Sequence, residues 1–128
     1  MCEGLTPQFL STDSVQQIHV DVVDSAQLDH CDKDRLDSAV RAVESYADYG
    51  QPDDLFDLAA AYAFYISEAQ AFLDGNKRTA FTACTVFLKI NGVPTQIYND
   101  GDLFDWMLEL ANKQIGRKEF AERLRSPF

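Results

Sequence analysis

The sequence contains few cysteines and histidines, which excludes several kinds of site. It has three cysteines and two histidines among 128 residues. Cys2, Cys31 and Cys84 are too few and too scattered for a disulfide framework or a Cys-x-x-Cys zinc site, so we expect reduced thiols. The adjacent pair His30 and Cys31 lacks further nearby ligands, which leaves a metal site there only as a minor alternative. With only His19 and His30 available, a Ser-His-Asp arrangement cannot be assembled convincingly.

Long apolar runs and an excess of basic residues are also absent. No run approaches the roughly 20 apolar residues of a membrane span. The first residues lack the basic start and apolar stretch of a signal peptide, so we expect a soluble, cytoplasmic protein without a membrane partner. The chain has 21 acidic and 11 basic residues, a formal net charge of −10. Because a reader of nucleic acid needs a basic face, this charge argues against direct binding to nucleic acid.

The pattern of apolar residues indicates helices rather than strands. Hydrophobic residues make up 46% of the chain, enough to fill the core of one domain spanning residues 1–128. All six glycines and all four prolines fall where the apolar periodicity breaks, and alternating strand patterns are nearly absent. The sequence therefore predicts an all-α fold, a single compact domain of about six helices.

The expected helices follow from apolar spacing and capping residues. Ser11 or Thr12 can cap the first helix, and Pro94 blocks continuation of the fourth. Thr95 to Tyr98 is expected to form a short extended piece. The helices expected are one from about residue 12, one around 36–43, two buried ones over 54–69 and 79–90, one from about residue 102, and a short one carrying Phe120 and Leu124.

A ten-residue segment between the two most apolar stretches combines a turn with charge. Residues 70–79 read Gln-Ala-Phe-Leu-Asp-Gly-Asn-Lys-Arg-Thr. Gly75 permits a tight turn and the close approach of an anion, and Asn76 tolerates unusual dihedrals while bringing a side-chain amide. Lys77 and Arg78 add positive charge where the following helix should begin, so the backbone amides and the helix dipole would both favour phosphate.

Asp74 beside this loop suggests a cation. A carboxylate is unlikely to contact phosphate directly, and it would instead hold a bridging divalent ion, most simply magnesium. The combination describes a clamp for a nucleotide triphosphate. The segment lacks the Gly-x4-Gly-Lys-Ser/Thr spacing of a P-loop, and on generic grounds a capped turn with solvated charges explains it equally well.

The segment closely resembles the signature of the Fic/Doc family, His-x-Phe-x-Asp/Glu-Gly/Ala-Asn-x-Arg. Asn-Lys-Arg-Thr-Ala, starting at Asn76, is particularly similar to the Doc branch. The resemblance extends over most of the chain, from Phe-Leu-Ser-Thr-Asp-Ser-Val-Gln-Gln-Ile-His (9–19) through Asp-Leu-Phe-Asp-Leu-Ala (54–59) to Phe-Leu-Lys-Ile-Asn-Gly-Val (87–93). It implies a small helical toxin of a toxin-antitoxin pair.

The resemblance also implies roles for individual residues. The family's loop binds a nucleotide triphosphate such as ATP, with Asp74 holding Mg²⁺. Gly75, Asn76 and Lys77 would form the anion hole, and Arg78 would contact phosphate. Phe72 would anchor the loop in the core. Family members typically transfer AMP to a protein hydroxyl, whereas Doc-like members transfer the terminal phosphoryl group to the elongation factor that delivers aminoacyl-tRNA.

One position departs from the signature. The family's general-base histidine is replaced by Gln70, and an amide cannot accept a proton near neutral pH. Three explanations remain open: a deliberate inactivating substitution, a naturally degenerate member, or a substitute base such as His19 or Glu68. Because general-base catalysis is worth about 10²- to 10⁴-fold, we expect this chain to bind nucleotide but to transfer slowly or not at all.

A second departure concerns regulation. Self-inhibited Fic proteins usually carry a Ser/Thr-x3-Glu-Gly/Asn segment and a second arginine, but here the segment is missing and Phe81 stands at the arginine position. Inhibition would then come from another chain, an antitoxin whose disordered stretch folds into a groove. The alternative function is a non-catalytic module that binds nucleotide or protein on a degenerate Fic fold.

Overall fold

The described part of the protein is helical, as predicted. The computed structural model describes residues 6–23 and 31–128. Within these ranges it has six α-helices and one short 3-10 helix, and no strand beyond an isolated bridge. The helices are α1 (Thr12–Val22), α2 (Lys33–Tyr49), α3 (Leu55–Ala69), α4 (Asn76–Ile90), η2 (Thr95–Ile97), α5 (Asp100–Ala111) and α6 (Arg117–Arg125).

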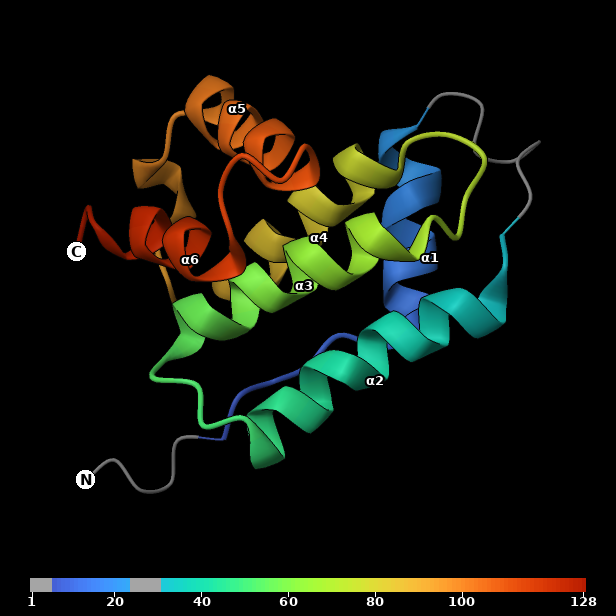
Figure 1. The fold of residues 1–128 in the computed structure, drawn as a ribbon, viewed down its shortest axis with the longest axis horizontal. Helices are drawn as coiled ribbons and strands as arrows, with labels where there is room; N and C mark the ends of the chain where they lie inside the picture. Colours follow the sequence, from blue (N-terminus) through green and yellow to red (C-terminus); the bar gives the residue numbers. More distant parts are fainter. Residues whose placement is uncertain (1–5, 24–30) are drawn as a thin grey trace.

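The antiparallel pair α3 and α4 forms the centre of the molecule (Figure 1). Helices α2 and α6 pack on α3, while α1 and α5 pack on α4. Four alanines of α3 are fully buried, and such small side chains allow neighbouring helices to approach closely. Tyr62 of α3 and Phe87 of α4 fill the space between the two helices, with ring centroids 5.1 Å apart. The α3–α4 connection, residues 70–75, is therefore held by two buried helices.

The helix starts differ in whether a side chain caps them. Side chains cap four of them: Ser11 for α1, Asp32 for α2, Asp54 for α3 and Asn99 for α5. Each side chain accepts a hydrogen bond from an amide of the first turn, which satisfies donors that the helix itself leaves over. Besides α6, which begins after Gly116, helix α4 begins after Gly75, which has no side chain to do this. Its first amides are thus left for another partner.

Two details differ from the sequence-based expectation. Residues 95–97 form a 3-10 helix rather than an extended piece, since the amides of Ile97 and Tyr98 bond back to Pro94 and Thr95. Helix α4 begins at Asn76, three residues before the predicted start. His30 and Cys2 lie outside the described residues, and within those residues no helix is long and apolar enough to cross a membrane.

Candidate functional site

The residues predicted to form the site lie together at one cleft. Its volume is about 290 Å³, and it is open to solvent at the start of α4. Asp74, Lys77 and Arg78 are exposed there. The lining consists of Gln70, Leu73, Asp74, Gly75, Asn76, Lys77 and Arg78, together with Phe104 of α5.

The backbone at the start of α4 is arranged to receive an anion. The first intrahelical hydrogen bond runs from the amide of Thr79 to the carbonyl of Gly75, at 2.9 Å. The preceding amides, at residues 76–78, are those that an α-helix leaves without intrahelical partners. They lie at the positive end of the helix dipole, beside the cations Lys77 and Arg78. A phosphate in the cleft would meet backbone donors and positive charge together.

The side chain of Asn76 has a structural role rather than the ligand role that its amide suggested. It is 8% exposed, and its Oδ1 accepts from the amide of Phe72 at 3.1 Å. Its Nδ2 donates to the carbonyl of Phe72 at 2.8 Å. The side chain thus pairs with both backbone groups of Phe72 and fixes the bend of the loop, so Asn76 can offer an anion only its backbone amide.

Gly75 is required by both conformation and space. Its φ of +81° lies in the left-handed region, which glycine enters without steric cost. A Cβ added here would lie 2.3 Å from Cγ2 of Val23, just after α1. Close packing against Val23 therefore leaves room for the bare backbone alone.

His19 supports the loop from behind, a role that sequence reasoning missed. Its ring stacks on Phe72 with centroids 3.7 Å apart and planes 6° apart. Its Nε2 lies 2.9 Å from the carbonyl oxygen of Asp74, and because a carbonyl only accepts, Nε2 carries the proton and donates. A helical pattern places His19 four residues after buried Val15, but only the fold reveals its partners.

Phe72 is buried, as its predicted anchoring role requires, with 5% of its surface exposed. Phe72 also forms an antiparallel bridge with Cys31, and the amide of Asp32 donates to the carbonyl of Ala71 at 2.7 Å. The loop is thereby attached to α1, to the segment before α2 and to α4. Such multiple attachment pre-organises a binding loop.

Gln70 ends α3 in a left-handed conformation, with φ 49° and ψ 45°. Its Nε2 donates to the carbonyl of Ser67 at 2.8 Å, and its Oε1 lies 3.4 Å from Nδ2 of Asn76. Histidine is several-fold enriched among non-glycine residues at positive φ, so this backbone accepts the family's residue. The side chain at position 70 faces the loop whose amides would hold phosphate.

Neither candidate substitute base lines the cleft. His19 is 2% exposed and its Nε2 proton is engaged by Asp74. Glu68 pairs with Lys113 at 2.9 Å and lines a neighbouring groove instead of the cleft. A general base must reach the proton that it removes, so neither side chain is placed to act as a base on a group bound in the cleft.

Phe104 is a second residue that sequence reasoning missed. The guanidinium carbon of Arg78 lies over its ring, 5.9 Å from the centroid. Phe81 packs edge-on against Phe104 from α4, with ring centroids 6.1 Å apart. Phe104 thus packs against Phe81 and holds the guanidinium of Arg78 along one wall of the cleft.

The donors around Asp74 fit a magnesium ion that arrives with phosphates. Among residues 6–23 and 31–128, no group of three or more His, Cys, Asp and Glu side chains could hold a metal by itself. Mg²⁺ commonly uses one or two carboxylates and completes its shell with substrate phosphates and water. Asp74, beside the amides of α4, matches that arrangement.

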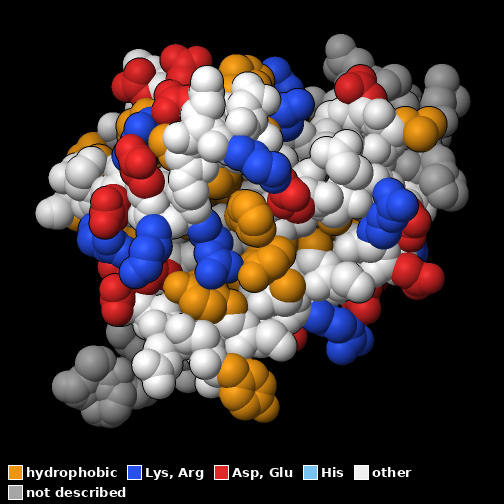
Figure 2. Space-filling view, viewed as in Figure 1, with side chains coloured by type: hydrophobic (Ala, Val, Ile, Leu, Met, Phe, Trp, Pro, Cys, Tyr) orange, Lys and Arg blue, Asp and Glu red, His pale blue; other side chains and the backbone are white. Residues whose placement is uncertain are grey.

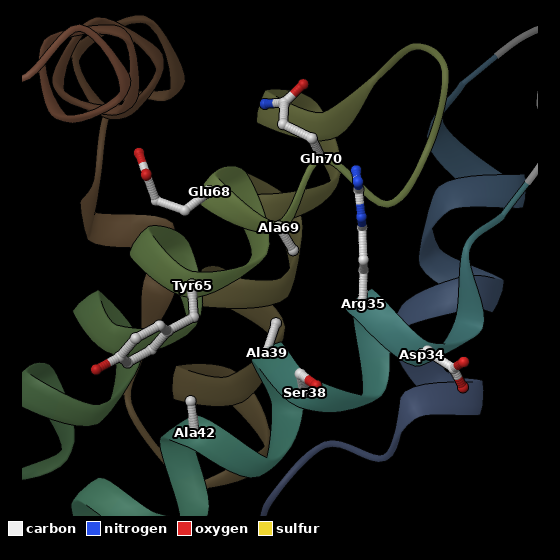
Figure 3. Close-up of a pocket in the computed structure, with 9 residues that line it drawn as sticks. All are labelled: Asp34, Arg35, Ser38, Ala39, Ala42, Tyr65, Glu68, Ala69 and Gln70. Atoms are coloured by element: carbon white, nitrogen blue, oxygen red, sulfur yellow. The ribbon is translucent and has the colours of Figure 1, made fainter.

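A larger groove meets the cleft at Gln70. It lies between α2 and α3 and has a volume of about 620 Å³ (Figure 3). Its floor contains Ala39, Ala42 and Ala69, and Tyr65 lies toward its far end. Gln70 lines both the groove and the cleft. The two depressions therefore adjoin each other at Gln70.

Comparison with known proteins agrees with this geometry. The Fic/DOC family model matches residues 9–88, which include α1 to most of α4. A protein named "Protein kinase doc" from Escherichia phage P1 is 31% identical over 94 residues, 73% of each chain. A protein named "Toxin Doc" from Mycolicibacterium smegmatis is 39% identical over 71 residues, 55% of each chain. With the signature loop at the start of α4 and the match over most of its length, the chain belongs to the Fic/DOC family.

Proposed function

We propose that this chain is the toxin of a toxin-antitoxin pair and that its fold serves transfer of a phosphoryl group from ATP to a protein hydroxyl. The observation that carries the proposal is the cleft where the uncapped start of α4, Asp74, Lys77 and Arg78 meet Gln70. Both similar proteins are named as Doc, and one of them is named as a protein kinase. The name favours phosphoryl transfer over the AMP transfer typical of the wider family.

The residues divide the work of phosphoryl transfer, which depends mainly on positioning and on stabilising charge. The amides at the start of α4 hold the phosphate oxygens, and Lys77 and Arg78 neutralise their charge. Asp74 would hold Mg²⁺, which when bound offsets further phosphate charge. Phe104 keeps Arg78 directed along the cleft wall. Position 70 lies where the accepting hydroxyl must lose its proton.

Gln70 leaves the proposed phosphate-binding residues in place but provides no general base. Its amide keeps two local hydrogen-bonding contacts, to Ser67 and Asn76, so the loop geometry does not depend on a histidine. We expect ATP to bind and transfer to be slower by about 10²- to 10⁴-fold than with a histidine.

The experiment compares the protein with its Gln70→His variant. Each is incubated with Mg²⁺, a cell extract and ATP labelled at the α or γ phosphate, and the label in protein is followed. We expect γ label in protein with Gln70→His and little with Gln70. Gln96→His, an exposed position on η2, is the matched control and should behave like the parent. Incorporation of α label would mean AMP transfer instead.

The target and the inhibitor are also proposals. The acceptor is expected to be the elongation factor that delivers aminoacyl-tRNA, which purified factor in place of extract tests directly. The inhibitor is expected to be an antitoxin encoded beside this chain. If the product of the neighbouring reading frame does not bind the purified protein, the antitoxin proposal fails.

A non-catalytic binding module is the second candidate function. The observation that favours it is that both ends of the Gln70 side-chain amide have hydrogen-bonding partners, Ser67 and Asn76. A glutamine at this position is therefore compatible with the surrounding structure. ATP binding without label transfer by either Gln70 or Gln70→His protein would support this function and reject the kinase.

A further inference from the structure

The groove between α2 and α3 extends the site away from the nucleotide. The groove shares Gln70 with the cleft. A polypeptide bound in the groove would therefore approach the loop of the cleft at position 70. Figure 2 shows hydrophobic side chains gathered over α2 and α3 on this face, with Lys and Arg side chains on both sides. An apolar floor with a charged rim is typical of a surface that binds polypeptide.

The floor allows a partner to approach closely. Ala39, Ala42 and Ala69 present only methyl groups, and Ser38 at the rim is small and exposed. Larger side chains at these positions would fill the space between the two helices. The groove volume of about 620 Å³ is in the range of ligand-binding pockets, and its shape is an open trough rather than a closed cavity.

The rim carries charges of both signs: Asp34 and Arg35 on α2, and Glu68 on α3. Arg35 of α2 extends toward the end of α3 where Gln70 lies (Figure 3). Arg35 pairs with Asp32 at 3.5 Å, and its side chain remains 62% exposed. Glu68 of α3 pairs with Lys113 and remains 41% exposed. Exposed pairs of this kind are weak, so Arg35 can exchange its partner for an acidic side chain of a bound segment.

We propose that this groove seats the segment of the acceptor protein that carries the hydroxyl, an inference that rests on the proposed function. The acceptor chain lies along the alanine floor with its hydroxyl residue at Gln70, facing the terminal phosphate in the cleft. An acidic side chain of the segment contacts Arg35. This assignment adds a protein-substrate site, whereas the cleft itself binds only the nucleotide.

The test blocks the groove without disturbing the core. In the Gln70→His background, Ser38→Trp places an indole on the groove, while Ser45→Trp adds the same side chain about two turns further along α2. Ser45 is exposed and lies outside the groove lining. We expect Ser38→Trp to slow γ-label transfer to extract protein about tenfold, equivalent to about 1.4 kcal/mol of lost binding. Ser45→Trp should transfer like its parent.

Two further measurements keep the result interpretable. ATP affinity and thermal unfolding of Ser38→Trp should match the parent, which separates loss of the acceptor from loss of the fold. Arg35→Ala should raise the acceptor concentration needed for half-maximal transfer, whereas Arg41→Ala should not. Arg41 is exposed on the same helix, pairs with Asp37 at 2.7 Å and does not line the groove.

The outcomes distinguish the two proposals. Full transfer by Ser38→Trp overturns the groove assignment while the proposed function stands. Equal losses in Ser38→Trp and Ser45→Trp also overturn it, as does a loss in Arg41→Ala equal to that in Arg35→Ala. If Gln70→His alone labels nothing, the proposed function fails before any groove variant is measured, and the acceptor role of the groove falls with it.

Discussion

The ring of His19 lies flat against the ring of Phe72, with centroids 3.7 Å apart and planes 6° apart. The same histidine donates from Nε2 to the carbonyl of Asp74, two residues further along the loop. One side chain of α1 thus contacts the loop through both its face and its edge. The first helix thereby helps to shape the loop beside the cleft, although none of its residues lines the cleft.

Substituting His19 separates the two contacts. His19→Phe keeps an aromatic ring against Phe72 but removes the donor to Asp74, and the lost hydrogen bond should cost about 1 kcal/mol of stability. His19→Ala removes both and leaves a cavity, which should cost about 3 kcal/mol. Urea unfolding measures both values, and ATP titration should show weaker binding for each variant. Unchanged ATP affinity in His19→Phe would show that the hydrogen bond does not shape the loop.

Thr79 offers a stabilising substitution. It is fully buried in the first turns of α4, and its hydroxyl has no hydrogen-bond partner among the described residues. Valine has the same shape and removes the unpaired polar group, so Thr79→Val should raise stability by about 1 kcal/mol. Differential scanning calorimetry should show a higher Tm. A lower Tm would show that the hydroxyl has a partner in solution.

Gly75→Ala should damage the loop through both backbone and packing. A residue with a Cβ at φ +81° is strained by about 1–2 kcal/mol, and the Cβ also clashes with Val23. The double substitution Gly75→Ala with Val23→Ala relieves the clash but not the strain. Unfolding free energies should therefore rank the original protein first, the double variant second and Gly75→Ala last. Equal values for the two variants would assign the whole effect to the backbone.

Acid should weaken the attachment of α6 to the start of α3. Burial of Asp54 tends to raise its pKa, but hydrogen bonds from Arg125 and from the amides of Asp57 and Phe56 outweigh this effect and hold the pKa below its ordinary value. A carboxyl with a depressed folded-state pKa stabilises the protein above its unfolded pKa of about 3.9, and this contribution is lost as the pH falls through the folded value.

Asp54→Asn isolates that contribution. The amide oxygen can still cap α3, but the charge paired with Arg125 at 2.6 Å is gone. Both side chains are about one-third exposed, so the loss at pH 7 should be only about 1 kcal/mol. Unfolding measured from pH 7 down to about pH 3 should show a smaller decline for Asp54→Asn than for the original protein. Parallel pH profiles would contradict this role.

Local pattern predicted most of the helices, because each carries its own signals. Buried Leu36, Val40 and Val43 recur at helical spacing in α2, and the apolar stretches of α3 and α4 are the central helices. The prediction of an extended segment after Pro94 was wrong. A pattern of four residues cannot distinguish a 3-10 turn from a strand when no pairing strand can be identified. The apolar stretch 79–90 marked only the more buried part of α4, which begins one turn earlier at Asn76, where the charged loop was expected to meet a helix start.

The candidate site was predictable where it is contiguous and not where it depends on the fold. Residues 70 and 74–78 are neighbours in sequence, so their meeting in one cleft needed only a turn. His19 and Phe104 join the site from α1 and α5, and the groove requires the packing of α2 on α3. The sequence showed that Asn76 brings a polar side chain to the loop. It could not show that this side chain hydrogen-bonds to the backbone of Phe72.

The bond between His19 and Asp74 joins residues 55 positions apart. Closing a chain loop of that length costs conformational entropy, which the contacts of the closed loop must offset. The α3–α4 connection therefore keeps its observed shape only while α1 is docked behind it. The proposed binding of ATP at this loop therefore depends on the docking of α1 as well as on the loop itself.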